Sequence, residues 1–242
     1  MVPNLSNVLA SVRTLTSALT GWLAPHACFV CGATGVVAPV CAACDDELPR
    51  LGDACPVCAT PTLDAQACGR CLREPPAYDT TVALFEYRLP VDRMVQALKY
   101  RHRLALAAYF SRLMAGACRP DRPVDMILPM PLHGARLRER GFNQAVELAR
   151  PLARAWGLPL ELARVERVSN VAPQASLPWK ARRLNMRGAF GCHGSLEGKK
   201  VLVVDDVMTT GATLDALASL LKRHGAARVD NLVVARTLPP DG

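Results

Sequence analysis

The sequence lacks any uninterrupted apolar run of about 18–20 residues, the length that a membrane-spanning helix needs. Its first 25 residues carry a single charge, Arg13, and have neither the basic start nor the compact apolar core of a secretory signal. We therefore expect a cytoplasmic protein without a transmembrane segment. The pattern Gly-x-x-x-x-Gly-Lys-Ser/Thr is also absent, which excludes a P-loop nucleoside triphosphatase by pattern. Aromatic residues make up only 5% of the 242 residues, so platforms for stacking nucleic-acid bases are few.

The composition is otherwise that of an ordinary globular protein, with 50% hydrophobic and 21% charged residues. The net charge of +8 is unevenly spread along the chain. Residues 1–75 carry four Lys/Arg against six Asp/Glu, whereas residues 76–242 carry 25 against 15. The basic residues gather at positions 99–103, 136–140 and 180–187. Such clusters suit phosphorylated ligands or nucleic acid, although many charge runs are simply solvated surface.

Eight of the ten cysteines form four Cys-x-x-Cys pairs. Each pair can aim two thiolates at one point, and two pairs complete a tetrahedral zinc site. Disulfides would need an oxidising compartment, and a redox Cys-x-x-Cys usually occurs once, beside a βαβ pattern. We therefore predict two structural Zn²⁺ ions that replace the missing apolar core of this segment. The predicted ligands are Cys28, Cys31, Cys41, Cys44, Cys55, Cys58, Cys68 and Cys71.

The pairing of these four turns is open from the sequence. Sequential couples would give two stacked zinc ribbons, and interleaved couples would give a cross-braced site. The gap inside each successive couple is nine residues both times, which favours the sequential arrangement. Ahead of the cysteines, apolar residues at three- and four-residue steps predict an amphipathic helix over residues 4–23. We expect an N-terminal helix in residues 1–25, a double zinc ribbon in 26–75, and a larger domain in 76–242.

In the larger domain, strand-like and helix-like segments alternate after Pro75 and Pro76. This alternation predicts an α/β domain with a largely parallel sheet flanked by helices, whose ligands bind at the carboxyl ends of the strands. The expected strands cover residues 80–88, 124–128, 201–204 and 229–235. The expected helices cover residues 91–100, 104–118, 141–156 (with a kink at Pro151) and 212–224.

The most informative segment, residues 201–213, reads Val-Leu-Val-Val-Asp-Asp-Val-Met-Thr-Thr-Gly-Ala-Thr. A buried strand leads into two carboxylates, then into a loop of hydroxyl residues, then into a helix. Backbone N–H groups of such a loop and the helix N-terminus bind anions, and a glycine lets a ligand approach closely. The two acids, expected at the solvent-facing end of the strand, suit a sugar diol. The segment therefore predicts a cradle for a phosphorylated ribose, against the alternative that Asp and Thr merely cap the helix.

This segment resembles the phosphoribosyl-diphosphate (PRPP) motif of type I phosphoribosyltransferases. Residues 128–144, Leu-Pro-Met-Pro-Leu-His-Gly-Ala-Arg-Leu-Arg-Glu-Arg-Gly-Phe-Asn-Gln, are more specific. Together with the cysteine pairs, they resemble the ComF family of competence-associated, phosphoribosyltransferase-like proteins. The resemblance extends to Lys99-Tyr100, Pro173-Gln174 and residues 187–190, and it implies a type I phosphoribosyltransferase-like fold preceded by the zinc ribbons.

The resemblance implies a site at the ends of two strands. The PRPP-binding residues would be Asp205, Asp206, Thr209, Thr210, Gly211, Ala212 and Thr213, with the acids on the ribose hydroxyls. The diphosphate would lie beside Pro131, Leu132 and His133, with Mg²⁺ held mostly by the ligand itself. The guanidinium groups of Arg136, Arg138 and Arg140 match diphosphate oxygens, although these residues could also occupy an exposed turn.

Three further assignments stay open from the sequence. His133 is a candidate proton carrier or a structural residue. Asn143 and Gln144 either read a base or cap a helix. Residues 169–187 form either a mobile lid or an exposed basic loop.

Two functions from different classes fit these features. In the first, a ComF-like competence protein handles single-stranded DNA in natural transformation or DNA uptake, with a site for PRPP or a nucleotide. In the second, the chain is an active phosphoribosyltransferase that uses PRPP and an unidentified acceptor. With eight thiolates and two Zn²⁺ ions, residues 1–75 would carry about −6, a poor anchor for DNA phosphates. DNA is therefore expected on the larger domain, and the ribbons are expected to be structural or to dock other proteins, such as those of the competence machinery.

Overall fold

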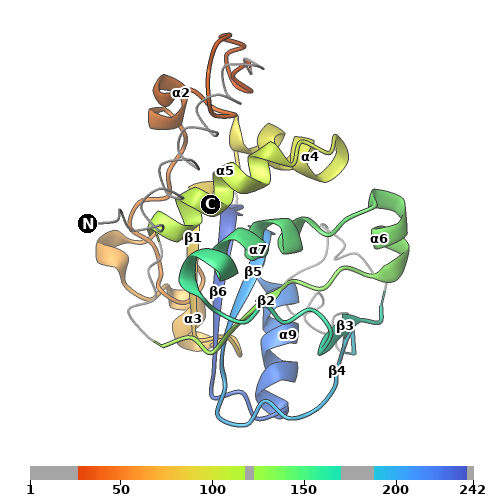
Figure 1. The fold of residues 1–242 in the computed structure, drawn as a ribbon. Helices are drawn as coiled ribbons and strands as arrows, with labels where there is room; N and C mark the ends of the chain where they lie inside the picture. The colour runs from red at the N-terminus through yellow and green to blue at the C-terminus, as the bar shows by residue number, and fades with distance from the viewer. Residues whose placement is uncertain (1–26, 118–122, 170–187, 239–242) are drawn as a thin grey trace, which may run out of the picture. The chain divides into compact units, whose positions relative to one another are not determined.

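The chain divides by its internal contacts into two units, Met1–Leu48 and Pro49–Gly242. The computed structural model describes residues 27–117, 123–169 and 188–238 (Figure 1). The first four paired cysteines belong to the first unit and the other four to the second. The helix predicted over residues 4–23 lies outside the described residues, and the boundary expected at residue 75 stays a prediction.

A parallel sheet forms the centre of the larger unit. Its strands follow the order β1 (Thr80–Glu86), β6 (Arg228–Arg236), β5 (Lys200–Met208) and β2 (Met126–Pro129). All three neighbouring pairs are parallel, and Pro129 at the end of β2 lies beside Val204 of β5. The central strands are apolar along most of their length because both of their faces are covered. The predicted parallel α/β sheet is confirmed.

Helices cover the sheet on both faces (Figure 1). Side chains alternate along β5, so Val201 and Val203 point to one face, where they pack with leucines of α9 (Ala212–Arg223). Leu202 and Val204 point to the other face, where α7 (Gln144–Trp156) packs on β2 and β5. On that side, α5 (Ala105–Ala117) contacts α7, β1 and β6, and α4 (Val91–Tyr100) contacts α5.

Two features of this unit differ from the sequence expectations. A separate helix, α6 (Gly134–Arg140), precedes α7, and the two are divided by Gly141, which adopts the left-handed conformation with φ +79°. A small antiparallel sheet also forms between β3 (Val165–Arg167) and β4 (Phe190–Cys192). The lid considered for residues 169–187 falls almost wholly outside the described residues. In the described part of the chain, we find no helix with the length and apolarity to cross a membrane.

Candidate functional site

The two cysteine groups combine the pairs in sequential order. The sulfur atoms of the first group (Cys28, Cys31, Cys41 and Cys44) all lie within 4.8 Å of one another, as do those of the second (Cys55, Cys58, Cys68 and Cys71). A tetrahedral Zn²⁺ with Zn–S bonds of about 2.3 Å separates its sulfurs by about 3.8 Å. The Sγ atoms of Cys31 and Cys41 are 3.9 Å apart, and those of Cys58 and Cys68 are 3.6 Å apart. Both groups therefore fit a tetrathiolate zinc ion.

The two groups also repeat each other in their local structure. Cys41 precedes the short helix α2 (Ala42–Asp46), and Cys68 precedes α3 (Gly69–Arg73). The backbone N–H of Cys41 donates to the Cys28 sulfur at 3.4 Å, and that of Cys68 donates to the Cys55 sulfur at 3.3 Å. Such N–H···S bonds favour the thiolate, which is the form that binds metal.

The second cysteine group is part of the core of the larger unit. Cys55, Cys58 and Cys71 are buried in the same cluster as residues of β5, β6 and α9. A short 3₁₀ helix, η1 (Leu63–Ala65), lies between its two cysteine turns. Burial alone would raise the pKa of the Cys58 thiol, but hydrogen bonding with Thr60 lowers that pKa to about 6. This cysteine is therefore prepared to ligate as a thiolate at neutral pH.

The candidate phosphoribosyl loop follows β5. Thr209 and Thr210 leave the strand, Gly211 adopts φ +82°, and α9 begins at Ala212. A Cβ atom on Gly211 would lie 2.9 Å from the hydroxyl of the buried Tyr78. Glycine is thus required here by the backbone conformation and by the protein's own packing.

Backbone N–H groups of this loop are available to a ligand. Within residues 27–117, 123–169 and 188–238, no group accepts a hydrogen bond from the backbone N–H of Thr209, Thr210 or Gly211. The N–H of Ala212 donates to the Thr210 hydroxyl at 3.4 Å. These donors lie directly before the N-terminus of α9, whose dipole also favours negative charge. The arrangement can bind a phosphate.

The two acids have different environments. Asp206 is only 3% exposed, and its carboxylate lies 2.9 Å from the Lys99 ammonium group of α4. The expectation that both acids lie at the solvent-facing end of the strand is therefore wrong for Asp206. Asp205 points to the opposite face, is half-buried, and accepts a hydrogen bond from the Asp206 N–H at 2.8 Å. Its charge interacts with that of Arg167 on β3.

The pKa of Asp205 is raised to about 7. Burial is the largest cause and the negative charge of Asp206 is the next, while Lys99 acts in the opposite direction. Burial, the largest single cause, lowers the pKa of Lys99, but the attractions of Asp206, Asp205 and Tyr87 together raise it above the usual value. Lys99 is thus charged at neutral pH, and Asp205 changes its protonation state near neutral pH.

The segment after β2 lies beside the end of β5. The Met130 N–H donates to the carbonyl of Val204, the residue before the two acids, at 2.8 Å, and the half-buried Pro131, Leu132 and His133 follow Met130. Asn143 fixes this segment, because its side-chain NH₂ donates to the Met130 carbonyl at 3.0 Å. The two strand ends that the sequence associates with one ligand are therefore neighbours.

Two of the open assignments have structural roles. The His133 Nδ1 accepts a hydrogen bond from the Ala135 N–H at 3.2 Å and so caps α6. The Asn143 Oδ1 accepts from the Ala145 N–H at 2.9 Å and caps α7. Gln144 is buried and accepts a hydrogen bond from Arg140.

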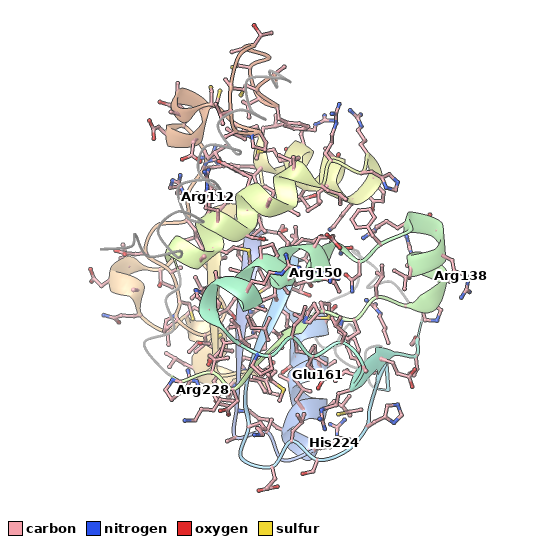
Figure 2. All side chains as sticks on the ribbon, in the orientation of Figure 1. Arg112, Arg138, Arg150, Glu161, His224 and Arg228 are labelled. Atoms are coloured by element: carbon pink, nitrogen blue, oxygen red, sulfur yellow. The ribbon has the colours of Figure 1, made fainter. Side chains whose placement is uncertain are left out.

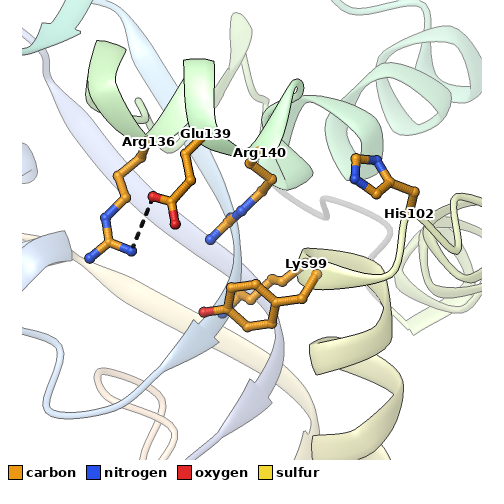
Figure 3. Close-up of a pocket in the computed structure, with 6 residues that line it drawn as sticks. Lys99, His102, Arg136, Glu139 and Arg140 are labelled. Carbon is orange, nitrogen blue, oxygen red and sulfur yellow. Dashed lines mark ion pairs between the residues drawn. The ribbon is translucent and has the colours of Figure 1, made fainter.

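A basic hollow opens between α4 and α6 (Figure 3). Arg136 and Arg140 stand one turn apart on α6 and face it, and Arg140 lies 5.3 Å from the centre of the Tyr100 ring. Arg136 also lies 3.9 Å from Glu139. Arg138 lies on the outer side of α6, pointing away from the fold (Figure 2). The hollow is lined by Lys99, Tyr100, His102, Arg136, Glu139 and Arg140.

Sequence reasoning did not assign three residues that contact the candidate site. Lys99 pairs with Asp206, Arg167 interacts with Asp205, and Arg236 at the end of β6 donates to the carbonyls of Met208 and Thr209. Lys99 carried a usable signal, since it belongs to a basic cluster and to the family resemblance. Arg236 carried a weaker signal, because it is a charged residue directly after the apolar run of residues 232–235.

The comparisons with known proteins agree with this architecture. The model of the phosphoribosyl transferase domain matches residues 140–238, and that of the double zinc ribbon domain matches residues 19–72. The DNA utilization protein YhgH of Salmonella typhimurium is 34% identical over 210 residues, covering 82% of this chain and 91% of that protein. Competence protein F of Haemophilus influenzae is 30% identical, covering 82% and 85%. Among solved structures, adenine phosphoribosyltransferase from Thermoanaerobacter pseudethanolicus matches with 17% identity and a TM-score of 0.36, covering 56% of this chain and 83% of that one.

The family models and the two cysteine groups together define the class of protein. The chain combines a type I phosphoribosyltransferase-like domain with an N-terminal double zinc ribbon, and its two Cys₄ groups support structural zinc. It belongs to the ComF family of competence and DNA utilization proteins, which also includes the 28% identical competence protein ComFC of Bacillus subtilis. The family resemblance and the fold predicted from the sequence are confirmed.

Proposed function

We propose that this chain handles single-stranded DNA in natural transformation or DNA uptake, and that its residues 205–213 bind the phosphoribosyl group of PRPP or of a nucleotide. The proposal rests on one observation, that three features lie together near the ends of the neighbouring strands β2 and β5. Available N–H groups follow β5, two carboxylates lie in its last four residues, and a basic hollow shares Lys99 with one of those carboxylates.

The ligand's groups can be matched to these features. The 5′-phosphate would accept hydrogen bonds from the 209–213 loop, where Thr209, Thr210 and Thr213 add hydroxyl donors. Asp205 would accept from the ribose diol, because it is the more exposed residue of the two. Asp206 would act mainly by holding Lys99 at the site. The diphosphate, with Mg²⁺, would lie near Pro131, Leu132 and His133.

The basic hollow is the proposed path for DNA. Its cations, Lys99, Arg136 and Arg140, can follow a phosphate backbone. Tyr100 is 63% exposed at the end of α4, so a base can stack on it as it would on other single-strand binding surfaces. The thiol-rich zinc groups fit a reducing compartment, so we place this role in the cytoplasm, where proteins of the competence machinery would be its partners.

The second candidate function is phosphoribosyl transfer to an unidentified acceptor. It is favoured by the same cradle, since a site that holds PRPP beside Arg136 and Arg140 can also stabilise a departing diphosphate. The two functions differ in one product. Only the transferase releases diphosphate from PRPP.

The test measures binding and turnover on the full zinc-loaded chain. A fluorescent oligo-dT should bind with an affinity that falls as salt rises, with a slope of about −0.7 per phosphate neutralised. PRPP should weaken this binding if the two ligands meet at the shared Lys99. Absence of oligo-dT binding at low salt, together with diphosphate release from PRPP and a candidate acceptor, would replace the first function with the second. Absence of both PRPP binding and DNA binding would refute the proposal.

A further inference from the structure

The second cysteine group and the 209–213 loop are joined by one buried guanidinium group. Arg236 is only 3% exposed and stands at the end of β6. Its Nε donates to the Cys58 carbonyl at 2.9 Å, and its Nη2 donates to the Thr60 hydroxyl at 3.2 Å. Its Nη1 donates to the carbonyls of Met208, Thr209 and Thr237. One edge of the forked guanidinium group therefore binds the turn that contains Cys58, and the other edge binds the end of β5.

A second arginine makes the same kind of connection. Arg70 lies between Cys68 and Cys71 in α3, and its Nη1 donates to the Thr210 carbonyl at 3.4 Å. Arg70 also interacts electrostatically with Cys58. A zinc ion with four thiolates carries a net charge of −2, which two guanidinium groups at the centre can balance. The zinc-loaded second group would thus supply negative charge that offsets the desolvation of the buried Arg236 and the half-buried Arg70.

These contacts control the direction of the loop's N–H groups. In a trans peptide unit the C=O and the following N–H point in opposite directions. Carbonyls of Met208, Thr209 and Thr210 that point to the arginines therefore turn the N–H groups of Thr209, Thr210 and Gly211 away from them. Those are the donors that find no acceptor among the described residues. The arginines thus act on the backbone that would bind the phosphate.

We propose that Arg236, assisted by Arg70, is a positioning residue that makes the phosphate-binding conformation of residues 209–211 depend on the metal-loaded second cysteine group. The first cysteine group belongs to the other unit and serves as the comparison in the metal test. The inference rests on the proposed function for the identity of the ligand. It goes beyond it by assigning the second group a role in ligand binding as well as in folding.

The first test compares Arg236→Lys with Arg228→Lys on the zinc-loaded full chain. Lysine keeps the charge but cannot span both sides as the planar fork does. Arg228 is the matched control, because it lies at the other end of β6 and pairs with Asp230 at 2.7 Å (Figure 2). A third variant, Thr60→Val, removes the hydroxyl that accepts from Arg236 at nearly constant volume. It also removes the Thr60–Cys58 hydrogen bond, so its binding is measured on samples shown to hold two zinc ions per chain.

The readouts separate loop positioning from general stability. In Arg236→Lys, ribose 5-phosphate should bind at least about tenfold more weakly by calorimetry, a change of about 1.4 kcal/mol. The amides of residues 209–211 should exchange faster, while zinc content and exchange in the middle of β5 stay unchanged. Thr60→Val should show the same pattern to a smaller degree, and Arg228→Lys should show none of it. Unchanged affinity and exchange in both Arg236→Lys and Thr60→Val would overturn the inference, as would a uniform loss of protection across the sheet.

The second test varies the metal. Cys31→Ser removes a ligand of the first group only and should bind ribose 5-phosphate like the parent. A chelator that then removes the remaining zinc should abolish this binding, and added Zn²⁺ should restore it. Binding that persists without zinc in the second group would overturn the coupling. If the parent protein itself fails to bind ribose 5-phosphate, the proposed function fails. In that case the amide exchange of Arg236→Lys still decides whether the arginine orders the loop.

Discussion

Replacing Asp206 by Asn should destabilise the protein far more than replacing the neighbouring Asp205. The Asp206 side chain is 4% exposed and lies 2.9 Å from Lys99, whose side chain is 20% exposed. Removing one partner of a buried ion pair costs about 3–5 kcal/mol, because the other charge stays buried. Lys99 can still reach water, so we expect the lower end, about 3 kcal/mol. For a chain of this size that corresponds to a melting temperature lower by about 6–12 °C.

Asp205→Asn is the matched control for this prediction. Burial and the charge of Asp206 raise the pKa of Asp205, so its ionised form is disfavoured in the folded protein. Asn removes that cost, and the melting temperature at pH 8 should stay the same or rise. Binding of ribose 5-phosphate should nevertheless weaken by about 1.5–3 kcal/mol, the value of a lost charge-assisted hydrogen bond.

The assay is thermal and denaturant unfolding followed by circular dichroism on the zinc-loaded chain. Lys99→Met completes a double-mutant cycle, in which the two changes together should cost about 2 kcal/mol less than their sum. The reasoning is refuted if Asp205→Asn and Asp206→Asn lower the melting temperature equally. A coupling below about 0.5 kcal/mol between Lys99 and Asp206 would refute it as well.

Three further predictions concern pH, metal and DNA. Because the pKa of Asp205 is raised to about 7 from a usual value of about 3.9, its contribution to stability should fall as the pH rises from about 4 to 7 and stay constant above. Ribose 5-phosphate binding should strengthen through pH 7, in part because the phosphate itself ionises at about pH 6. Asp205→Asn should remove the stability dependence and reduce the binding dependence to the share of the phosphate, and a titration that Asp205→Asn leaves unchanged would contradict this. Elemental analysis should find about two zinc ions per chain, and a single zinc in the parent, or iron in its place, would count against two ribbons. Cys41→Ser should lose one zinc without lowering the melting temperature of the α/β unit. Cys68→Ser should lower that melting temperature, because its cysteine group is part of the core of the larger unit. Arg136→Ala combined with Arg140→Ala should reduce the slope of log affinity for oligo-dT against log salt by about 1.4, which is two phosphates at about 0.7 each. An equal effect of replacing the outward-facing Arg138 by Ala would argue against the hollow as the DNA path.

Much of the fold could be predicted because its central elements carry strong local patterns. The strand expected at residues 229–235 appears as β6, Arg228–Arg236, because its apolar residues, Val229 and Leu232–Ala235, are buried in a strand covered on both faces. The expected helix at 91–100 matches α4 residue for residue. In contrast, α6 has seven residues with three arginines and no buried side chain, so no apolar period marks it. The strands β3 and β4 have three residues each and exist through their mutual pairing.

In the candidate site as well, the parts that are contiguous in sequence could be predicted and the parts that depend on distant segments could not. The loop after β5 and the two acids are contiguous, so their sequence alone predicts an anion cradle. The partner of Asp206 lies on α4, and the support of the loop comes from β6 and from the second cysteine group. Such contacts join segments far apart in sequence and leave no period or spacing to read. The burial of Asp206 was therefore not predictable from its motif.

The Lys99–Asp206 pair also bears on how one site could serve both proposed ligands, a sugar diol and a polyanion. Two adjacent carboxylates would repel DNA phosphates if both faced the ligand as anions. Here Lys99 offsets the charge of Asp206, and the charge of Asp205 is reduced at neutral pH by its raised pKa and faces Arg167. Arg136 and Arg140 then leave the adjoining hollow basic. Removing Lys99 should therefore weaken DNA binding by more than the loss of one cation, because it also exposes the negative charge of Asp206 to the DNA phosphates.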